Sequence, residues 1–344
     1  MINIKADKIV RDQVRDNFVN KQEIGGVTLI VLSSAKIRRD LRENLLNKFP
    51  EVTFIFRDKM NEAEEELPHA DILITYGEDL TQAHIERAAK LKWIMVISAG
   101  IDRMPFQAIK EKNIFVTNAR GIHKTPMAEY AISMMLQVAR KAKAIISNEQ
   151  NQVWERKIEM SELSGKTIGV LGAGAIGQEI ARLSKAFQMK TIGLNRSGKQ
   201  VENFDEIFSY DQMRTILERA DFVVSVLPKT KETNNLLGLE EFKRMKNDAI
   251  LINIGRGNVI NDADLISALN EGELAHAVLD VFNEEPLVKE HPYWEMEQVT
   301  VTPHISGISP QYQPRALNIF EENLKVFLAK KENYINVIDL ERGY

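Results

Sequence analysis

The stretch VLGAGAIGQEIARLSKAFQMKTIGLNRSG, residues 170–198, decides the fold of this 344-residue chain. Its glycines, Gly172, Gly174 and Gly177, stand where an apolar strand gives way to a helical pattern that we expect to begin near Ile176. In such a turn the first glycine permits a tight bend, the second lets the backbone approach a diphosphate, and the third allows close helix–strand packing. The free N–H groups of the helix then point at the phosphates. The sequence therefore predicts a dinucleotide-binding turn.

The residues after the second strand of this stretch bear on which dinucleotide binds. An NAD site usually carries Asp or Glu about 20 residues after the glycines, where the carboxylate accepts bonds from the ribose hydroxyls. This chain has Asn195 there, followed by Arg196, Ser197 and Lys199. A 2′-phosphate needs the positive charge and donors that these side chains offer. The pattern favours NADP, with NAD as the second choice and a solvated surface turn as the alternative without a binding role.

Short apolar runs alternate with helical patterns on both sides of the glycine turn. Near-continuous Val, Ile and Leu runs of this kind are typical of parallel sheets covered on both faces. The predicted strands lie at residues 27–34, 52–56, 71–77 and 92–100, and then at 167–172, 190–195, 221–228, 249–255, 275–282 and 299–304. We therefore expect an α/β protein of two doubly wound parallel-sheet domains, a Rossmann-type cofactor domain and a flavodoxin-like substrate domain, with an interdomain cleft.

Two longer helical patterns flank the second series of strands. One runs from Pro126, a residue favourable in a first helical turn, to Gln150, and the other spans residues 311–330. The last pattern could either cover the second domain or return to the first. We assign residues 119–309 to the dinucleotide-binding domain, and residues 1–118 with 310–344 to the substrate domain.

Composition excludes several classes of function. Apolar residues make up 44% and charged residues 27% of the chain, as in soluble globular proteins, and the net charge is −4. Neither nucleic acid nor membrane is expected as a partner, because no basic excess and no membrane-spanning run are present. The absence of cysteine rules out disulfides and thiolate chemistry, and no metal is needed. The N-terminal MINIKADKIVRDQVRD lacks an apolar signal core, so we expect a cytoplasmic protein.

Three later segments supply side chains for chemistry at the ends of predicted strands, where ligands bind in open α/β sheets. The segments are NIGRG at 253–257, LDVFNEEP at 279–286 and TPHISG at 302–307. Arg256 offers a planar fork for a carboxylate, and His304 can exchange a proton near neutral pH. A carboxylate such as Glu285 orients a histidine ring and favours its protonated form. Taken singly, each has a structural alternative: a surface ion pair, a structural histidine or a solvated acid.

Together these motifs resemble the D-isomer-specific 2-hydroxyacid dehydrogenases, a family of NAD(P)-dependent oxidoreductases. GAGAIG, VSVLPKTKET, NIGRG, LDVFNEEPL and TPHISG occur in the family's order, and NARGIHKTPMAEYAISMMLQVARK resembles the segment between its domains. The resemblance extends from about Val27 to the last helix and leaves out the first 24 residues.

The resemblance implies roles for individual residues. Arg256 would hold the substrate carboxylate and carbonyl oxygen, and His304, partnered by Glu285, would be the general acid/base. We expect coenzyme contacts from Gly172, Gly174, Ala175, Ile176, Gly177, Asn195, Arg196, Ser197, Leu227, Pro228, Ile254, Gly255 and Asp280, the last of these at the nicotinamide amide. We expect substrate contacts from Tyr76, Gly77, Ala99, Gly100, Ile101 and Arg256.

The function predicted from the sequence is reduction of a small 2-oxoacid to the D-2-hydroxyacid, with NADPH favoured. Glyoxylate, hydroxypyruvate and branched-chain 2-oxoacids share the recognised head group, so the natural substrate stays open. One alternative is a binding protein that senses a nicotinamide dinucleotide on the same fold. A weaker one is an amino-acid dehydrogenase, which would need a central lysine motif that we do not find. The resemblance also implies a homodimer formed through residues 126–150.

Overall fold

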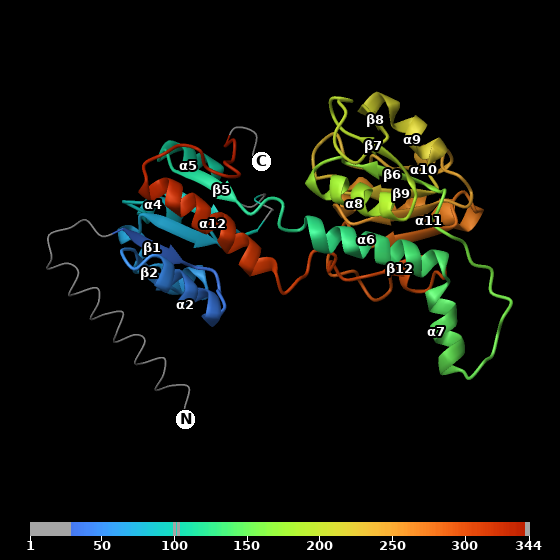
Figure 1. The fold of residues 1–344 in the computed structure, drawn as a ribbon, viewed down its shortest axis with the longest axis horizontal. Coiled ribbons are helices and arrows are strands. Elements are labelled where there is room, and N and C mark those ends of the chain that lie inside the picture. Colours follow the sequence, from blue (N-terminus) through green and yellow to red (C-terminus); the bar gives the residue numbers. More distant parts are fainter. Residues whose placement is uncertain (1–28, 99–100, 102–103, 341–344) are drawn as a thin grey trace, which may run out of the picture. The chain divides into compact units, whose positions relative to one another are not determined.

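The computed structural model of the chain describes residues 29–98, 101 and 104–340. The chain divides into two compact units. Unit 1 comprises the chain up to Ile122 together with the part from Pro310 onward, and unit 2 runs from His123 to Ser309. Figure 1 shows a twisted sheet with helices on both faces in each unit. Within the described ranges, no helix is both long and apolar enough to cross a membrane.

Unit 1 contains, among its described residues, a five-stranded parallel sheet in the order β2-β1-β3-β4-β5. Its strands are β1 (Ile30–Ser33), β2 (Thr53–Phe56), β3 (Ile72–Thr75), β4 (Trp93–Val96) and β5 (Phe115–Asn118). Its helices are α2 (Arg39–Lys48), α3 (Met60–Ala63), α4 (Gln82–Arg87), α5 (Phe106–Glu111) and α12 (Tyr312–Leu328), with a 3-10 turn at Leu67–His69. This strand order is that of flavodoxin-like sheets, as expected. Strand β5 was not predicted.

Helix α12 returns to unit 1, which decides between the two positions left open by the sequence. Its apolar face joins the core cluster formed by α2 and one face of the sheet. The ring of Phe320 stacks on the fully buried Trp93 of β4, with centroids 5.3 Å apart. Trp93 donates its indole N–H to Thr117 Oγ1 at 2.9 Å, so the polar edge of this core residue is also satisfied.

Unit 2 contains a seven-stranded parallel sheet in the part of the chain described, with the order β12-β11-β10-β9-β6-β7-β8. Its strands are β6 (Thr167–Leu171), β7 (Lys190–Leu194), β8 (Glu206–Phe208), β9 (Phe222–Ser225), β10 (Ile250–Asn253), β11 (His276–Leu279) and β12 (Val299–Val301). Numbered from the glycine turn, the order is 3-2-1-4-5-6 with a seventh strand, which is the Rossmann arrangement. The sequence missed the short strand β8.

The helices of unit 2 cover both faces of this sheet. They are α6 (Lys124–Ala139), α7 (Ala142–Gln150), α8 (Ala175–Ala186), α9 (Met213–Arg219), α10 (Leu239–Phe242) and α11 (Asp262–Glu271), with 3-10 turns at Tyr210–Gln212, Gly257–Val259 and Pro292–Trp294. Helices α6 and α8 bury apolar side chains against one face, and α9, α10 and α11 against the other. The strands are therefore buried on both sides, which explains their unbroken apolar sequences.

The long helical pattern that begins at Pro126 is not one helix, contrary to expectation. Helix α6 begins at Lys124 and ends at Ala139, and Lys141 has the left-handed φ of 55° before α7 starts. The side chain of Lys143 donates to the Val299 carbonyl at 2.7 Å, which fixes α7 in its new direction. No glycine or proline marks this break, so the helical periodicity continued through it.

Candidate active site and coenzyme site

The glycine turn between β6 and α8 has the geometry that a diphosphate requires. Gly172 has φ 109°, which only glycine adopts readily, and a Cβ at Gly177 would lie 2.2 Å from the Gly172 carbonyl oxygen. Helix α8 begins at Ala175 after Gly174, and no side chain of the described residues caps it. A Cβ at Gly174 would meet no atom of the described residues within 4 Å, so space for a ligand is left beside this glycine. The N–H groups of Ala175, Ile176 and Gly177 are thus left for an anion, and the residues fit a dinucleotide.

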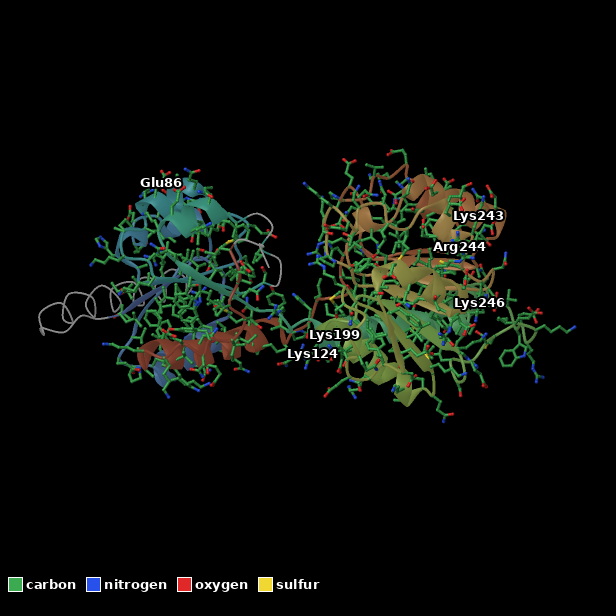
Figure 2. The ribbon with its side chains drawn as sticks, turned by 90° about the horizontal axis from the view of Figure 1, so that it is seen from above. Glu86, Lys124, Lys199, Lys243, Arg244 and Lys246 are labelled. Atoms are coloured by element: carbon green, nitrogen blue, oxygen red, sulfur yellow. The ribbon has the colours of Figure 1, made fainter. Side chains whose placement is uncertain are left out.

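The turn after β7 is closed by its own polar groups. Asn195 donates its amide to the Lys199 carbonyl at 2.8 Å and accepts the Ser197 N–H at 3.1 Å and its hydroxyl at 3.3 Å. Both functional groups of Asn195 therefore hold the turn, and Arg196 and Lys199 extend from it as exposed side chains. Figure 2 shows Lys199 far from the basic cluster of Lys243, Arg244 and Lys246 within unit 2. The cluster does not add to the positive charge at this turn.

Four further predicted coenzyme contacts follow β9 and β10. Leu227 and Ile254 are buried, and each belongs to one of the two core clusters of unit 2. A coenzyme could therefore contact their backbone but not their side chains. The Pro228 carbonyl already accepts the Thr233 hydroxyl at 2.7 Å. Gly255 follows Ile254 and is buried with it. These residues shape the sheet edge more than they supply polar groups.

The three segments predicted to carry the chemistry reach one edge of the sheet. Strands β10, β11 and β12 are neighbours and parallel, so the residues after them emerge side by side. A Cβ at Gly257 would lie 1.9 Å from the Phe282 carbonyl carbon, so only glycine lets these two segments touch. Arg256, immediately before it, donates from Nη1 to the Gly255 carbonyl at 2.9 Å and is half-buried. The guanidinium retains other N–H groups for a ligand.

His304 and Glu285 form a hydrogen-bonded pair at this edge. His304 Nδ1 lies 2.8 Å from Glu285 Oε2, and the other carboxylate oxygen accepts the Phe282 N–H at 3.0 Å. About half of the His304 side chain is exposed, at 52%. Because Nδ1 is engaged by the carboxylate, Nε2 is the nitrogen that can exchange a proton with a ligand. The pair has the geometry of an oriented acid/base.

Asp280 holds the loop that carries His304. Its fully buried carboxylate accepts the Thr302 hydroxyl at 2.5 Å and the N–H groups of Ile305 and Ser306 at 2.9 Å each. Its carbonyl accepts the N–H of His304 at 2.8 Å. His304 itself has a φ of 54°, a conformation that non-glycine residues keep only when their surroundings impose it. Both oxygens of the Asp280 carboxylate are therefore engaged by this loop. The contact of Asp280 with the nicotinamide amide stays a prediction.

The predicted substrate residues of unit 1 lie after the neighbouring strands β3 and β4. Tyr76 accepts a bond from the Gln313 amide at 3.2 Å through its hydroxyl, and its carbonyl accepts the Ser98 hydroxyl at 3.2 Å. Gly77 has φ 85°, and Ile101 is buried. Ala99 and Gly100 lie outside the described residues. Within unit 1, Tyr76, Gly77 and Ile101 thus share one sheet edge.

Sequence reasoning missed several residues that position these loops. Tyr130 lies with its hydroxyl 2.5 Å from Thr302 Oγ1, 172 positions further along the chain. Asn283 donates to Asp262 Oδ2 at 2.7 Å, and Tyr293 donates to Oδ1 of the same carboxylate at 2.9 Å, so the segments on both sides of Glu285 are tied to the start of α11. No local motif signals such pairs. In the described part of the chain, no group of three or more His, Asp or Glu side chains is arranged to hold a metal.

These features define a class: two-unit α/β proteins whose larger sheet carries a dinucleotide turn and an oriented histidine–carboxylate pair. Residues 132–306 match the family model described as D-isomer specific 2-hydroxyacid dehydrogenase, NAD binding domain. The chain belongs to the D-isomer specific 2-hydroxyacid dehydrogenase family of NAD(P)-dependent oxidoreductases. The resemblance seen in the motifs is confirmed.

Two curated relatives illustrate the range of this similarity. A glyoxylate reductase from Pyrococcus furiosus is 33% identical over 309 residues, which cover 85% of this chain and 91% of that protein. A D-3-phosphoglycerate dehydrogenase from Methanocaldococcus jannaschii is 35% identical over 278 residues, which cover 79% of this chain. The alignment covers 53% of that dehydrogenase, so the chain spans about half its length.

Solved structures share the fold over most of the chain. A D-isomer specific 2-hydroxyacid dehydrogenase family protein from Aeromonas salmonicida has a TM-score of 0.80 and 33% identity, covering 91% of this chain and 99% of that one. An NADPH-dependent glyoxylate/hydroxypyruvate reductase from Sinorhizobium meliloti, in complex with NADP and sulfate, has a TM-score of 0.77 and 27% identity. That alignment covers 92% of this chain and 100% of the reductase.

Proposed function

We propose that this protein reduces a small 2-oxoacid to the corresponding D-2-hydroxyacid with NAD(P)H, and that it prefers NADPH. The observation that carries the proposal is the 2.8 Å pair of His304 and Glu285 at the sheet edge where Arg256 also emerges. Unit 2 would hold the coenzyme, and residues 76, 77 and 99–101 of unit 1 would contact the acid.

Each side chain has a distinct task in this reaction. The coenzyme, when bound through the N–H groups at the start of α8, supplies the hydride. Arg256 binds the carboxylate of the acid and stabilises the negative charge that develops on the carbonyl oxygen. His304 gives that oxygen a proton from Nε2, while Glu285 keeps the ring oriented through Nδ1. In the oxidation direction His304 begins neutral and removes the hydroxyl proton.

The substrate class rests on the shared head group and on the relatives. Glyoxylate and hydroxypyruvate are the first candidates, because the similar proteins from Pyrococcus furiosus and Sinorhizobium meliloti are named for reduction of these acids. Branched-chain 2-oxoacids remain in the same class. The decisive experiment follows the loss of NADPH absorbance with a panel of 2-oxoacids, repeated with NADH. Coenzyme binding without oxidation by any acid would favour the alternative, a nicotinamide-sensing binding protein.

The preference for NADPH leads to a prediction at Arg196. Its side chain extends from a turn that lacks the usual carboxylate and would face a 2′-phosphate. Arg196→Ala should raise the KM for NADPH about tenfold to hundredfold, the loss expected for one charge-assisted contact, and leave the KM for NADH within about twofold. Initial rates with both coenzymes measure this. Lys243→Ala, in the basic cluster away from the turn, is the control. Equal losses with both coenzymes would contradict the proposed role.

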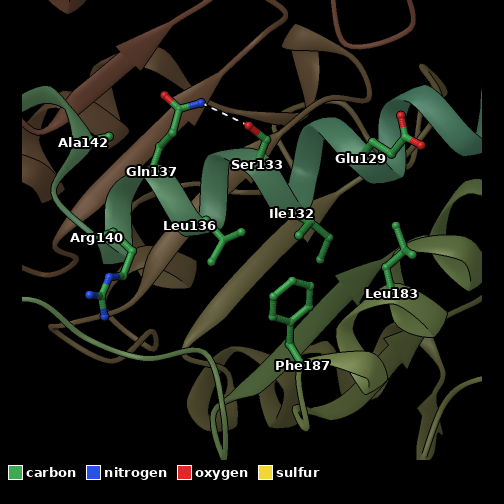
Figure 3. A pocket seen from close by; sticks show the side chains of 9 residues that line it. All are labelled: Glu129, Ile132, Ser133, Leu136, Gln137, Arg140, Ala142, Leu183 and Phe187. Carbon is green, nitrogen blue, oxygen red and sulfur yellow. Dashed lines mark hydrogen bonds between the residues drawn. The ribbon is translucent and has the colours of Figure 1, made fainter. Parts of the chain in front are cut away.

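We also propose that the protein is a homodimer formed through unit 2. Helix α7 has no buried side chain, and Ile145, Ile146, Val153 and Trp154 are exposed along it and the segment after it. Figure 1 shows this arm extending away from the sheet. Beside its start lies a groove where apolar side chains of α6 face those of α8, as Figure 3 shows: Ile132, Leu136, Leu183 and Phe187. If a two-fold axis relates two copies, the apolar arm of each copy can pack against the apolar groove of the other.

The dimer has a direct test at Trp154, whose side chain is 91% exposed within the chain. Trp154→Ala should weaken self-association by at least about thirtyfold, since a tryptophan at the centre of an interface contributes about 2 kcal/mol or more. Light scattering over a dilution series would record the shift toward monomer. Trp294→Ala, at another exposed tryptophan of unit 2, is the matched control. A wild-type chain that is monomeric at all concentrations would overturn the proposal.

A further inference from the structure

A chain of short hydrogen bonds links helix α6 to the loop that carries His304. The Tyr130 hydroxyl lies 2.5 Å from Thr302 Oγ1, and Thr302 Oγ1 lies 2.5 Å from Asp280 Oδ1. The same carboxylate accepts the N–H groups of Ile305 and Ser306, which follow His304 directly. Helix α6 and the ends of strands β11 and β12 are therefore connected through three polar side chains next to the acid/base residue.

The direction of each bond in this chain follows from the donors available. Thr302 has one hydroxyl proton and donates it to the Asp280 carboxylate. The remaining bond requires Tyr130 to donate to the Thr302 oxygen. Burial raises the pKa of Tyr130 to about 12, with the Asp280 charge adding to the rise, so the phenol keeps its proton at neutral pH. All the hydrogen bonds of this series are thus donated in one direction, from Tyr130 to Thr302 and from Thr302 to Asp280.

The two residues at the start of this series of hydrogen bonds, Tyr130 and Thr302, lie close to the boundaries of unit 2 in the sequence. The polypeptide enters unit 2 at His123 and leaves it at Ser309. Tyr130 lies seven residues after the entry and Thr302 seven residues before the exit. A second contact joins the same two segments, since a Cβ at Gly307 would lie 3.0 Å from His123 Nδ1. Inside unit 2, the entering and leaving segments are thus held to each other beside His304.

We propose that Tyr130 is a positioning residue for His304, acting through Thr302 and Asp280. The inference rests on the proposed function, in which His304 transfers the proton. Tyr130 touches neither the acid nor the coenzyme in this assignment. It fixes the hydroxyl of Thr302, which with Asp280 sets the backbone from 302 to 306 and holds His304 in its left-handed conformation. Loss of the phenol hydroxyl should therefore reduce kcat and leave coenzyme binding unchanged.

The kinetic test uses single variants and their combination. Tyr130→Phe should lower kcat about threefold to tenfold, as expected for one buried hydrogen bond, and Thr302→Val, which removes two bonds, should lower it about tenfold to hundredfold. Thr302→Ser should restore kcat to within about twofold because it keeps the hydroxyl. In the Thr302→Val background, Tyr130→Phe should cost no more than about twofold, because its effect passes through the missing hydroxyl. The dissociation constant for NADPH should stay within about twofold throughout.

A second readout does not depend on turnover. Hydrogen–deuterium exchange of peptides covering residues 302–309 should rise about tenfold in Tyr130→Phe and Thr302→Val, because the amides of Ile305 and Ser306 lose a fixed acceptor. Thr300→Val is the matched control: Thr300 lies in β12, two residues before Thr302, but its hydroxyl bonds His276 Nε2 at 2.9 Å. Unchanged exchange and kcat in both variants, or full additivity of the two, would overturn the inference. If the wild type reduces no 2-oxoacid, the proposed function fails, and the exchange result alone decides whether Tyr130 holds this loop.

Discussion

Replacing His304 with glutamine is expected to lower kcat for 2-oxoacid reduction by about a hundredfold to ten-thousandfold, the contribution of a positioned acid or base. His304 Nδ1 is held 2.8 Å from Glu285 Oε2, which leaves Nε2 as the proton donor. Glutamine can still bond to that carboxylate and is close in size, so the loop keeps its support. It cannot release a proton to a carbonyl oxygen. Stopped-flow decay of NADPH absorbance with glyoxylate or hydroxypyruvate would measure the loss.

Three comparisons make this prediction specific. The dissociation constant for NADPH, from coenzyme fluorescence, should remain within about twofold, since His304 does not line the glycine turn. The control substitution His69→Gln, at an exposed histidine of unit 1, should leave kcat unchanged. Glu285→Gln should cause a smaller loss, and none beyond that of His304→Gln in the double variant, because Glu285 acts through the imidazole. A His304→Gln enzyme with a near-wild-type rate would remove the acid/base assignment.

Arg256→Ala is expected to lower kcat/KM by about a thousandfold, the upper end for loss of one donor to a developing oxyanion. The loss should divide between KM and kcat, because the guanidinium binds the substrate carboxylate in the ground state and the carbonyl oxygen in the transition state. The backbone of the loop should survive the change. It is held by the Asn253 amide, which donates to the Arg256 carbonyl at 3.1 Å, and by the contact of Gly257 with Phe282.

Three further experiments test whether the loss in Arg256→Ala comes from the guanidinium group itself. Arg244→Ala removes a half-buried arginine of the basic cluster labelled in Figure 2, which precedes β10 whereas Arg256 follows it, and should leave kcat/KM unchanged. Free guanidinium at millimolar concentration should recover part of the activity of Arg256→Ala, since the lost group is a planar cation in an otherwise intact site. Arg256→Lys should remain impaired because an ammonium cannot form the same fork. An unchanged kcat/KM in Arg256→Ala would contradict the proposed substrate contact.

Much of the fold was readable from local sequence patterns. The apolar runs predicted ten of the strands, because strands buried on both faces of a parallel sheet must be apolar throughout. The glycine turn fixed the location of the Rossmann-type sheet, since Gly172 and Gly177 meet backbone constraints that other residues cannot. Strands β5 and β8 were missed because polar residues interrupt their apolar runs: β5 reads FVTN, and β8 reads EIF and has no fully buried residue. The division of the 126–150 helix at Lys141 was missed because tertiary contacts of α7, such as Lys143 with Val299, override helical periodicity.

The candidate site divides in the same way. Arg256, Glu285 and His304 could be chosen from the sequence because each follows a predicted strand, and ligands of open α/β sheets bind at those ends. The 2.8 Å pairing of Glu285 with His304 could not, since 19 residues and a strand separate them. The bonds that Asp280 makes to the loop of His304 gave no local signal either. Asn195 differs, because its amide bonds only residues 197 and 199 of its own turn, a local arrangement that asparagine commonly forms.

The sequence by itself determined the class of sheet, the place of the dinucleotide turn and the types of side chain available for proton and carboxylate chemistry. These follow from periodicity and from backbone conformations that only glycine adopts, both of which act over a few residues. The tertiary structure alone decided that α12 returns to unit 1 and that Tyr130, Thr302 and Asp280 form one chain behind His304. Hydrogen bonds between residues as much as 172 positions apart depend on where the sheet brings the chain together, and no local pattern encodes that meeting.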